Sequence, residues 1–203
     1  MKYTLALDMD GTITENNSWA LVHDFYKTNL PDWTDLFEEK KIDLLTWVKR
    51  DLPAVLKKYK TNDDDLLLSK LKLKPGFEDF LEKWALFFRK SGGISIISGG
   101  VPFIVKALGK KYKIDTHTVE YEKYTDKVII KKAMDGQDKQ KILQEYAKKG
   151  RVIYVADNSL KGFELKDYGD NIIKIIMDNY QKGKYFVKDF YELDKIIPDL
   201  IKQ

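Results

Sequence analysis

The sequence predicts an α/β fold, a doubly wound parallel sheet with an inserted helical segment, and three observations lead to this prediction. Short apolar runs of strand length recur along the 203 residues. Stretches with apolar residues at helical spacing lie between these runs, and such alternation is typical of parallel β-α-β units with helices on both faces of the sheet. One long segment near the N-terminus carries helical patterns only, which indicates an insertion into the alternating core.

Four apolar runs are predicted as strands of the sheet. Each mixes β-branched, aromatic or aliphatic residues over a strand-sized length, and small or polar residues follow each one, as expected for buried strands that lead into loops. These runs are KYTLALDM at residues 2–9, GGISIISGG at 92–100, RVIYVADNS at 151–159 and NIIKIIMDN at 171–179.

Helices are predicted between the strands, together with one β-hairpin. Residues 76–92 place five bulky apolar side chains at spacings of three and four before two glycines. Residues 138–150 form a second helical stretch, which ends at Gly150. In residues 118–132, two strand-like halves flank the sequence TDK, and this pattern predicts a hairpin.

Residues 15–73 form the predicted insertion, a helical cap. Three helical stretches fill it, at residues 18–30, 33–59 and 61–73. The core domain is then expected to comprise residues 1–14 and 74–203.

Composition narrows the classes of binding partner and the cellular compartments that we expect for this chain. A net charge of +4 comes with lysines spread along the whole chain, which predicts a solvated surface and no nucleic-acid partner. The absence of cysteine excludes disulfides and sulfur-bound metal sites. No apolar run approaches the roughly 18 residues of a membrane span, so we expect no membrane contact and a cytoplasmic location. A mildly basic protein attracts small anions such as phosphorylated metabolites. Composition leaves the oligomeric state open.

Two acids, Asp8 and Asp10, stand at the end of the first predicted strand. In open α/β sheets the ligand sits beyond the carboxyl ends of the strands, so these acids are expected at the binding site. Two neighbouring carboxylates repel each other unless a bound cation offsets their negative charge. Mg²⁺ is such a cation, because it prefers oxygen ligands. One carboxylate could then attack a phosphorus atom.

The sequence DMDGT at residues 8–12 resembles the first motif of the haloacid dehalogenase superfamily. The resemblance implies a Rossmann-like core in which Asp8 is the nucleophile that takes the phosphoryl group. It further implies that Asp10 serves as acid and base, and that Gly11 and Thr12 let backbone N–H groups approach the phosphate. The alternative is a capping loop of Asp, Gly and Thr, which is common in any protein.

The sequence SIISGG at residues 95–100 resembles the second motif of the same superfamily. Ser98 would then hydrogen-bond the transferring phosphoryl group, while Gly99 and Gly100 leave room for it and open the next helix. The alternative is an ordinary strand-to-helix turn, with serine as a cap and glycines for positive φ.

The third motif of the superfamily is a lysine that steadies the nucleophile and the phosphate. Lys139 in GQDKQKILQEY is the best candidate, because it lies at the head of a predicted helix, and Lys141 is its rival. In a chain so rich in lysine, either of them could instead be a surface residue.

The sequence VIYVADNS resembles the fourth motif, with Asp157 at the end of a predicted strand. The resemblance implies that Mg²⁺ is held by Asp157 together with Asp8 and Asp10. Relatives usually carry a second acid four residues later, whereas this chain has Lys161 there and Leu160 before it. Lys161 would either weaken Mg²⁺ binding or place a cation near the substrate.

The cap lies between the first and second motifs, which is its position in the phosphoserine phosphatase-like branch, and LKPGFEDFLEKW resembles the helix start of that branch. Phosphoserine phosphatases typically hold the substrate amino group with a Glu nine residues after the nucleophile, where this chain has Asn17, and Glu15 lies two residues early. The sequence DGTITENN is closer to the diketo-methylthio-phosphopentane phosphatases. The resemblance therefore implies a Mg²⁺-dependent phosphatase of small phosphate monoesters that works through an aspartyl-phosphate. A phosphate-binding regulatory protein and a phosphotransferase are the alternatives.

Overall fold

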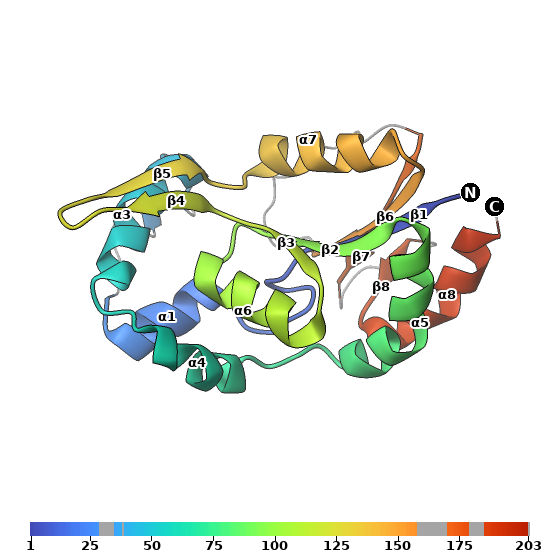
Figure 1. Ribbon diagram of the computed structural model, residues 1–203, viewed down its shortest axis with the longest axis horizontal. Coiled ribbons are helices and arrows are strands. Elements are labelled where there is room, and N and C mark those ends of the chain that lie inside the picture. The colour runs from blue at the N-terminus through green and yellow to red at the C-terminus, as the bar shows by residue number, and fades with distance from the viewer. Residues whose placement is uncertain (29–34, 38, 158–169, 179–184, 203) are drawn as a thin grey trace.

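The computed structural model describes residues 1–28, 35–37, 39–157, 170–178 and 185–202. Two groups of elements are visible in Figure 1: a sheet with its helices at one end, and a smaller group of helices with a hairpin at the other. None of the helices among the described residues is long and apolar enough to cross a bilayer.

A six-stranded sheet forms the core, and its described neighbours are parallel throughout, which confirms the predicted fold class. The four central strands are rich in β-branched and aliphatic residues, most of them buried. In spatial order the strands are β3 (Asp115–His117), β2 (Gly93–Ile97), β1 (Tyr3–Leu7), β6 (Arg151–Ala156), β7 (Ile172–Met177) and β8 (Phe186–Val187). The first strand of the chain therefore lies in the middle of the sheet, where both faces are covered.

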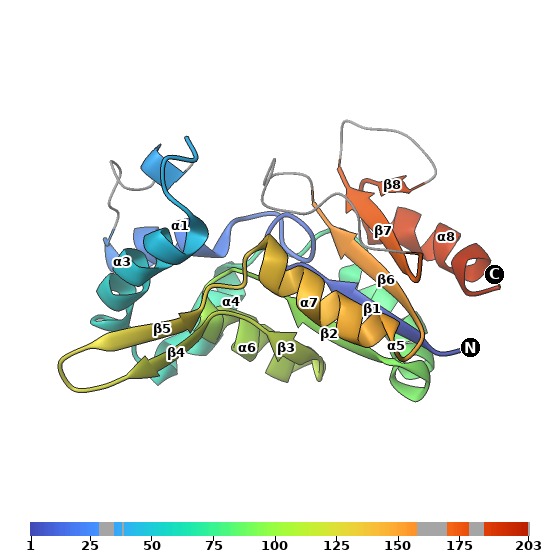
Figure 2. The ribbon, with the colours of Figure 1, turned by 90° about the horizontal axis from the view of Figure 1, so that it is seen from above.

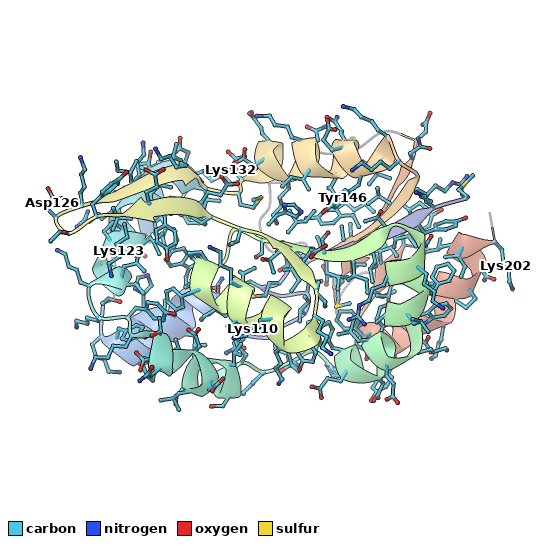
Figure 3. All side chains as sticks on the ribbon, in the orientation of Figure 1. Lys110, Lys123, Asp126, Lys132, Tyr146 and Lys202 are labelled. Carbon is cyan, nitrogen blue, oxygen red and sulfur yellow. The ribbon has the colours of Figure 1, made fainter. Side chains whose placement is uncertain are left out.

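Helices cover both faces of this sheet, as the doubly wound prediction requires (Figures 1 and 2). One face carries α7 (Gly136–Ala147), and the other carries α5 (Phe77–Ser91), α6 (Pro102–Tyr112) and α8 (Phe190–Ile201). Tyr146 of α7 lies close to the sheet, where its hydroxyl is 2.6 Å from His117 Nε2 of β3 (Figure 3).

The smaller group, which we call the cap region, joins helices from the predicted cap, residues 15–73, to a hairpin from the predicted core range. Its elements are α1 (Ser18–Tyr26), α3 (Leu44–Leu56), the 3-10 turn η1 (Thr61–Asp63), α4 (Asp64–Lys70), β4 (Glu120–Lys123) and β5 (Val128–Lys132). The two hairpin strands pair antiparallel, as the sequence predicts, and they form a separate two-stranded sheet. The hairpin lies along α3, where Lys123 Nζ donates to the carbonyl of Leu56 at 3.2 Å, and Asp126 marks its tip (Figure 3).

One predicted helical stretch of the cap is interrupted. The sequence pattern predicts helix over residues 33–59, whereas the structure has helix at residues 35–37, a turn at residues 39–42 and then α3 from Leu44 to Leu56. Asp43 explains the start, because its side chain accepts a hydrogen bond from Thr46 N at 2.7 Å, which caps the helix. Lys40, with a φ of 60°, turns the chain just before it.

The segments at the two ends of the helical insertion, residues 13–16 and 70–74, pair with each other. Glu15 N donates to the carbonyl of Lys72 at 2.7 Å, and Lys74 N donates to the carbonyl of Ile13 at 2.8 Å. The amide side chain of Asn16 also bonds to the second segment. The junction is therefore a short pair of hydrogen-bonded strands, and it lies directly beyond the loop that follows β1.

Candidate active site

The carboxyl end of the central strand β1 points toward the cap region (Figure 2), and Asp8 is the residue that directly follows this strand. All five residues of β1 are buried, and Asp8 N continues the strand pairing by donating to the carbonyl of Val155 at 2.9 Å. Asp8 is itself only 5% exposed. A carboxylate this buried needs donors for its oxygens, because an isolated buried charge is strongly unfavourable.

Both carboxylate oxygens of Asp8 have donors. Lys139 Nζ lies 2.5 Å from Oδ2, and Met9 N donates to Oδ1 at 2.7 Å. Lys139 is 4% exposed and extends from the first turn of α7, which Asp135 caps by accepting from Asp138 N. Of the two lysines considered from the sequence, Lys139 thus contacts Asp8, whereas Lys141 is exposed on the same helix.

Asp10 is held by the first residue of α1. Ser18 N donates to Oδ1 and Ser18 Oγ donates to Oδ2, both at 2.8 Å. Burial raises the pKa of Asp10 to about 7, and the negative charges of Asp8 and Asp157 add to the rise, while the bonds from Ser18 oppose it. Asp10 therefore lies close enough to Asp8 and Asp157 for their negative charges to raise its pKa.

Gly11 allows Asp157 to reach this group of acids. A Cβ atom on Gly11 would lie 2.1 Å from Asp157 Oδ2, so the carboxylate of Asp157 packs directly against the glycine. Gly11 also has a φ of +75°, a left-handed conformation that glycine adopts without strain. The next residue, Thr12, is fully buried, and its hydroxyl has no hydrogen-bond partner among the residues that the structure describes.

The loop after β2 packs against the loop after β1. Ser98 is 1% exposed, and its Oγ accepts from Gly100 N at 3.1 Å, which is the bond expected of a strand-to-helix turn. Because that bond uses Oγ as an acceptor, the hydroxyl hydrogen of Ser98 stays available to a ligand. A Cβ atom on Gly100 would lie 2.8 Å from Asp10 Oδ2, so this glycine is where the two loops meet.

Gly99 is the point at which the cap touches the second loop. Its carbonyl accepts from Trp19 Nε1 at 3.0 Å, and a Cβ atom on it would lie 3.3 Å from Leu44 Cδ2. Residues from α1 and α3 therefore pack against the turn that the second motif forms.

Sequence reasoning missed Ser18. Its side chain is fully buried and bonds to Asp10, eight residues earlier, and to Val101 N, 83 residues later. A serine beside an Asn at the start of a helical pattern indicates a helix cap, but nothing local shows which distant groups it contacts. By contrast, the structure brings the predicted site residues together around the ends of β1, β2 and β6.

The oxygen-rich group of Asp8, Asp10 and Asp157 fits a hard divalent cation. Mg²⁺ is usually held by one or two carboxylates and keeps several waters. Across the described ranges, no three acidic, histidine or cysteine side chains are arranged closely enough to enclose a metal ion by themselves. Leu160 and Lys161, the departures from the fourth motif, lie outside the described residues.

Comparison with known proteins gives one family. A model of the haloacid dehalogenase-like hydrolases matches residues 4–159, a range that contains every predicted site residue. No curated protein matches the sequence.

Solved structures share this fold at low sequence identity. A substrate-bound phosphoserine phosphatase complex superposes with a TM-score of 0.62 at 14% identity, covering 98% of both chains. A phosphoserine phosphohydrolase-like protein from Francisella tularensis gives a TM-score of 0.61 at 17% identity, covering 97% of this chain and 100% of that one. A hydrolase of the same superfamily from Salmonella enterica serovar Typhi gives a TM-score of 0.56 at 22% identity. The match covers 76% of this chain and 56% of that hydrolase.

Proposed function

The chain belongs to the haloacid dehalogenase-like hydrolases, and from that membership we propose that it is a Mg²⁺-dependent phosphatase of a small phosphate monoester. The observation that carries the proposal is the buried pair of Asp8 and Lys139 at the carboxyl end of the central strand. A buried ion pair contributes little to stability once desolvation is counted, so its position at the ligand-binding edge favours a chemical role.

Asp8 is the proposed nucleophile. Lys139 and the backbone N–H of Met9 each donate to one oxygen of Asp8, which fixes the direction of the carboxylate. Each oxygen still has a free lone pair. Attack by one oxygen forms a bond to phosphorus while the bond from phosphorus to the ester oxygen breaks, so the phosphoryl group moves to Asp8.

Asp10 is the proposed acid and base. It donates a proton to the leaving ester oxygen, then accepts a proton from the water that attacks the phosphorus of the aspartyl-phosphate. That second attack releases inorganic phosphate and restores Asp8. Its place beside Asp8, in contact with Gly100 of the second loop, supports this role.

The oxygens of the phosphoryl group need hydrogen-bond donors. We assign them to Lys139, to the hydroxyl of Ser98 and to the hydroxyl of Thr12, which is buried without a partner among the described residues. Such preorganised donors stabilise the charge that develops during phosphoryl transfer.

Mg²⁺ would be held by the carboxylates of Asp8 and Asp157, and the loop that carries Asp10 would lie beside the ion. When bound, the ion would neutralise charge on the phosphate oxygens. The close packing of Asp157 against Gly11 supports this assignment, because it brings a carboxylate from β6 to the loop after β1.

The leaving group is proposed only as a small alcohol. The structural relatives include phosphoserine phosphatases, but Asn17 of this chain uses its side chain to cap α1, accepting from Trp19 N and Ala20 N. Asn17 carries no charge, and its side-chain oxygen is already used in the helix cap, so we do not assign it to an amino group of the substrate. A panel of phosphorylated metabolites, including phosphoserine and methionine-salvage intermediates, would identify the substrate.

The first test is hydrolysis of a generic aryl phosphate. We expect turnover that requires Mg²⁺, no turnover in Asp8→Asn, and unchanged turnover in Lys141→Ala, which removes an exposed lysine from the same helix as Lys139. Mass spectrometry of a rapidly quenched reaction should place one phosphoryl group on Asp8. Activity retained in Asp8→Asn would contradict the proposal.

A further inference from the structure

Ser18 joins three separate segments of the chain at one buried hydroxyl. It is the first residue of α1, it donates through both N and Oγ to Asp10, and its Oγ accepts from Val101 N at 3.0 Å. Val101 precedes α6, and no side chain of its own helix caps that helix start. The loop after β1, the cap helix and the start of a core helix therefore meet at Ser18.

The direction of each hydrogen bond at Ser18 follows from the chemistry of its partners. Val101 N–H can only donate, so Ser18 Oγ must accept from it. The hydroxyl hydrogen of Ser18 is then directed to Oδ2 of Asp10, while the backbone N–H of Ser18 occupies Oδ1. With one donor on each oxygen, the plane of the Asp10 carboxyl group is fixed.

Close packing leaves Asp10 little freedom to choose another partner. A Cβ atom on Gly100 would lie 2.8 Å from both Asp10 Oδ2 and Ser18 Oγ, so the bonded pair lies directly against this backbone. Ser18 has no exposed surface, which excludes water as a competitor for the hydroxyl.

We propose that Ser18 is the positioning residue for Asp10 in the proposed reaction. This inference rests on the proposed function, because the fixed direction of the Asp10 carboxyl group affects the reaction only if Asp10 transfers the proton. It also makes the acid dependent on the cap, since Ser18 belongs to the first cap helix. An error of about 1 Å in the placement of a reacting group can reduce the rate by about a hundredfold.

A purely structural role makes a different prediction. If Ser18 Oγ served only to bond Val101 N, its loss would lower stability and leave the chemical step unchanged. The experiment must therefore separate kcat from stability and from substrate binding.

The test compares three variants in the Mg²⁺-loaded protein with an aryl phosphate as substrate. In Ser18→Ala, which loses the hydroxyl, we expect kcat to fall about tenfold or more with KM changed by less than about twofold. In Ser18→Thr, which keeps the hydroxyl, most of kcat should return. Asn17→Ala removes the neighbouring cap of α1 without touching Asp10, so it should lower the melting temperature and leave kcat near that of the wild type.

A crystal structure of Ser18→Ala gives a second readout that does not depend on turnover. We expect the carboxyl group of Asp10 to have rotated away from its wild-type position. A wild-type kcat in Ser18→Ala, or an equal loss in Asn17→Ala, would overturn the role of Ser18 while the phosphatase proposal stands. An inactive wild-type protein would instead overturn the proposed function, and the role of Ser18 with it.

Discussion

Two carboxylates are almost completely buried among the described residues, Asp8 in the core and Asp51 in the cap, and their surroundings differ. Asp8 has a donor on each oxygen, one of them the ammonium group of Lys139. Asp51 of α3 has His23 Nε2 at 3.1 Å from Oδ1, but the contact lacks hydrogen-bond geometry, and neither oxygen has a donor within the described part of the chain.

The difference shows that burial alone does not mark a reactive acid. Asp8 lies at the end of a strand, where a ligand can approach, and its two donors aim it in one direction. Asp51 lies in the cap helix α3 and contacts His23, whose ring centroid is 6.1 Å from that of Trp19 and 6.3 Å from that of Trp47. Two donors therefore hold the Asp8 carboxyl group in one direction, whereas the described contact of Asp51 is the one with His23.

The largest expected effect comes from breaking the core pair. In Lys139→Met, Asp8 loses its ammonium partner in a buried place, which should lower the free energy of unfolding by about 3–5 kcal/mol. Turnover of an aryl phosphate should fall by about 10²–10³-fold, because a charged group that faces the transferring phosphoryl group is gone. Urea denaturation and steady-state kinetics measure the two effects separately.

A double variant controls for this result. Asp8→Asn combined with Lys139→Met removes both charges, so much of the lost stability should return even though the protein is inactive. Lys141→Met, on the exposed face of the same helix, should change stability by less than about 0.5 kcal/mol. Additive losses in the double variant would show that the two side chains are not coupled.

The core elements could be predicted because their signals are local. Apolar runs that end in acids or glycines identified β1, β2 and β6, and the sheet then placed their ends together. The helix α8 was missed although Phe190, Leu193, Ile197 and Leu200 recur at helical spacing, whereas β3 and β8 are only three and two residues long and carry no usable period.

The contacts between segments could not be predicted in the same way. Asp10 and Ser18 are recognisable as a motif acid and a helix start, but their bond depends on how α1 leaves the loop after β1. Gly11 was assigned to phosphate approach, and the structure adds a reason that no local pattern contains, namely the carboxylate of Asp157 in van der Waals contact with it. Local chemistry therefore predicts which residues matter better than it predicts what they touch.

A smaller effect is expected from Gly11→Ala, for which Gly93→Ala is the control for backbone strain. In Gly11→Ala the new Cβ would lie 2.1 Å from Asp157 Oδ2, so the carboxylate must move. We expect the Mg²⁺ concentration for half-maximal turnover to rise about tenfold or more, since misplaced metal-site groups typically weaken binding by about 10–100-fold.

Gly93→Ala separates this displacement from backbone strain. Gly93 also has a positive φ, of 109°, but a Cβ there would meet no atom within 4 Å. Both variants should lose about 1–2 kcal/mol of stability from the left-handed backbone, and only Gly11→Ala should change the Mg²⁺ response. The same Mg²⁺ shift in both variants would assign the effect to strain.

The smallest effect is expected at the cap acid. Asp51→Asn keeps the shape of the side chain and changes a carboxyl group whose oxygens have no hydrogen-bond donor in the described structure, so no hydrogen bond is lost there. The free energy of unfolding should change by no more than about 1 kcal/mol, and turnover should match the wild type, because Asp51 is held within the cap. Denaturation of this variant beside Lys139→Met tests the comparison directly. A loss as large as that of Lys139→Met would mean that the contact with His23 supports the cap as strongly as Lys139 supports Asp8, and the distinction between the two buried acids would then fail.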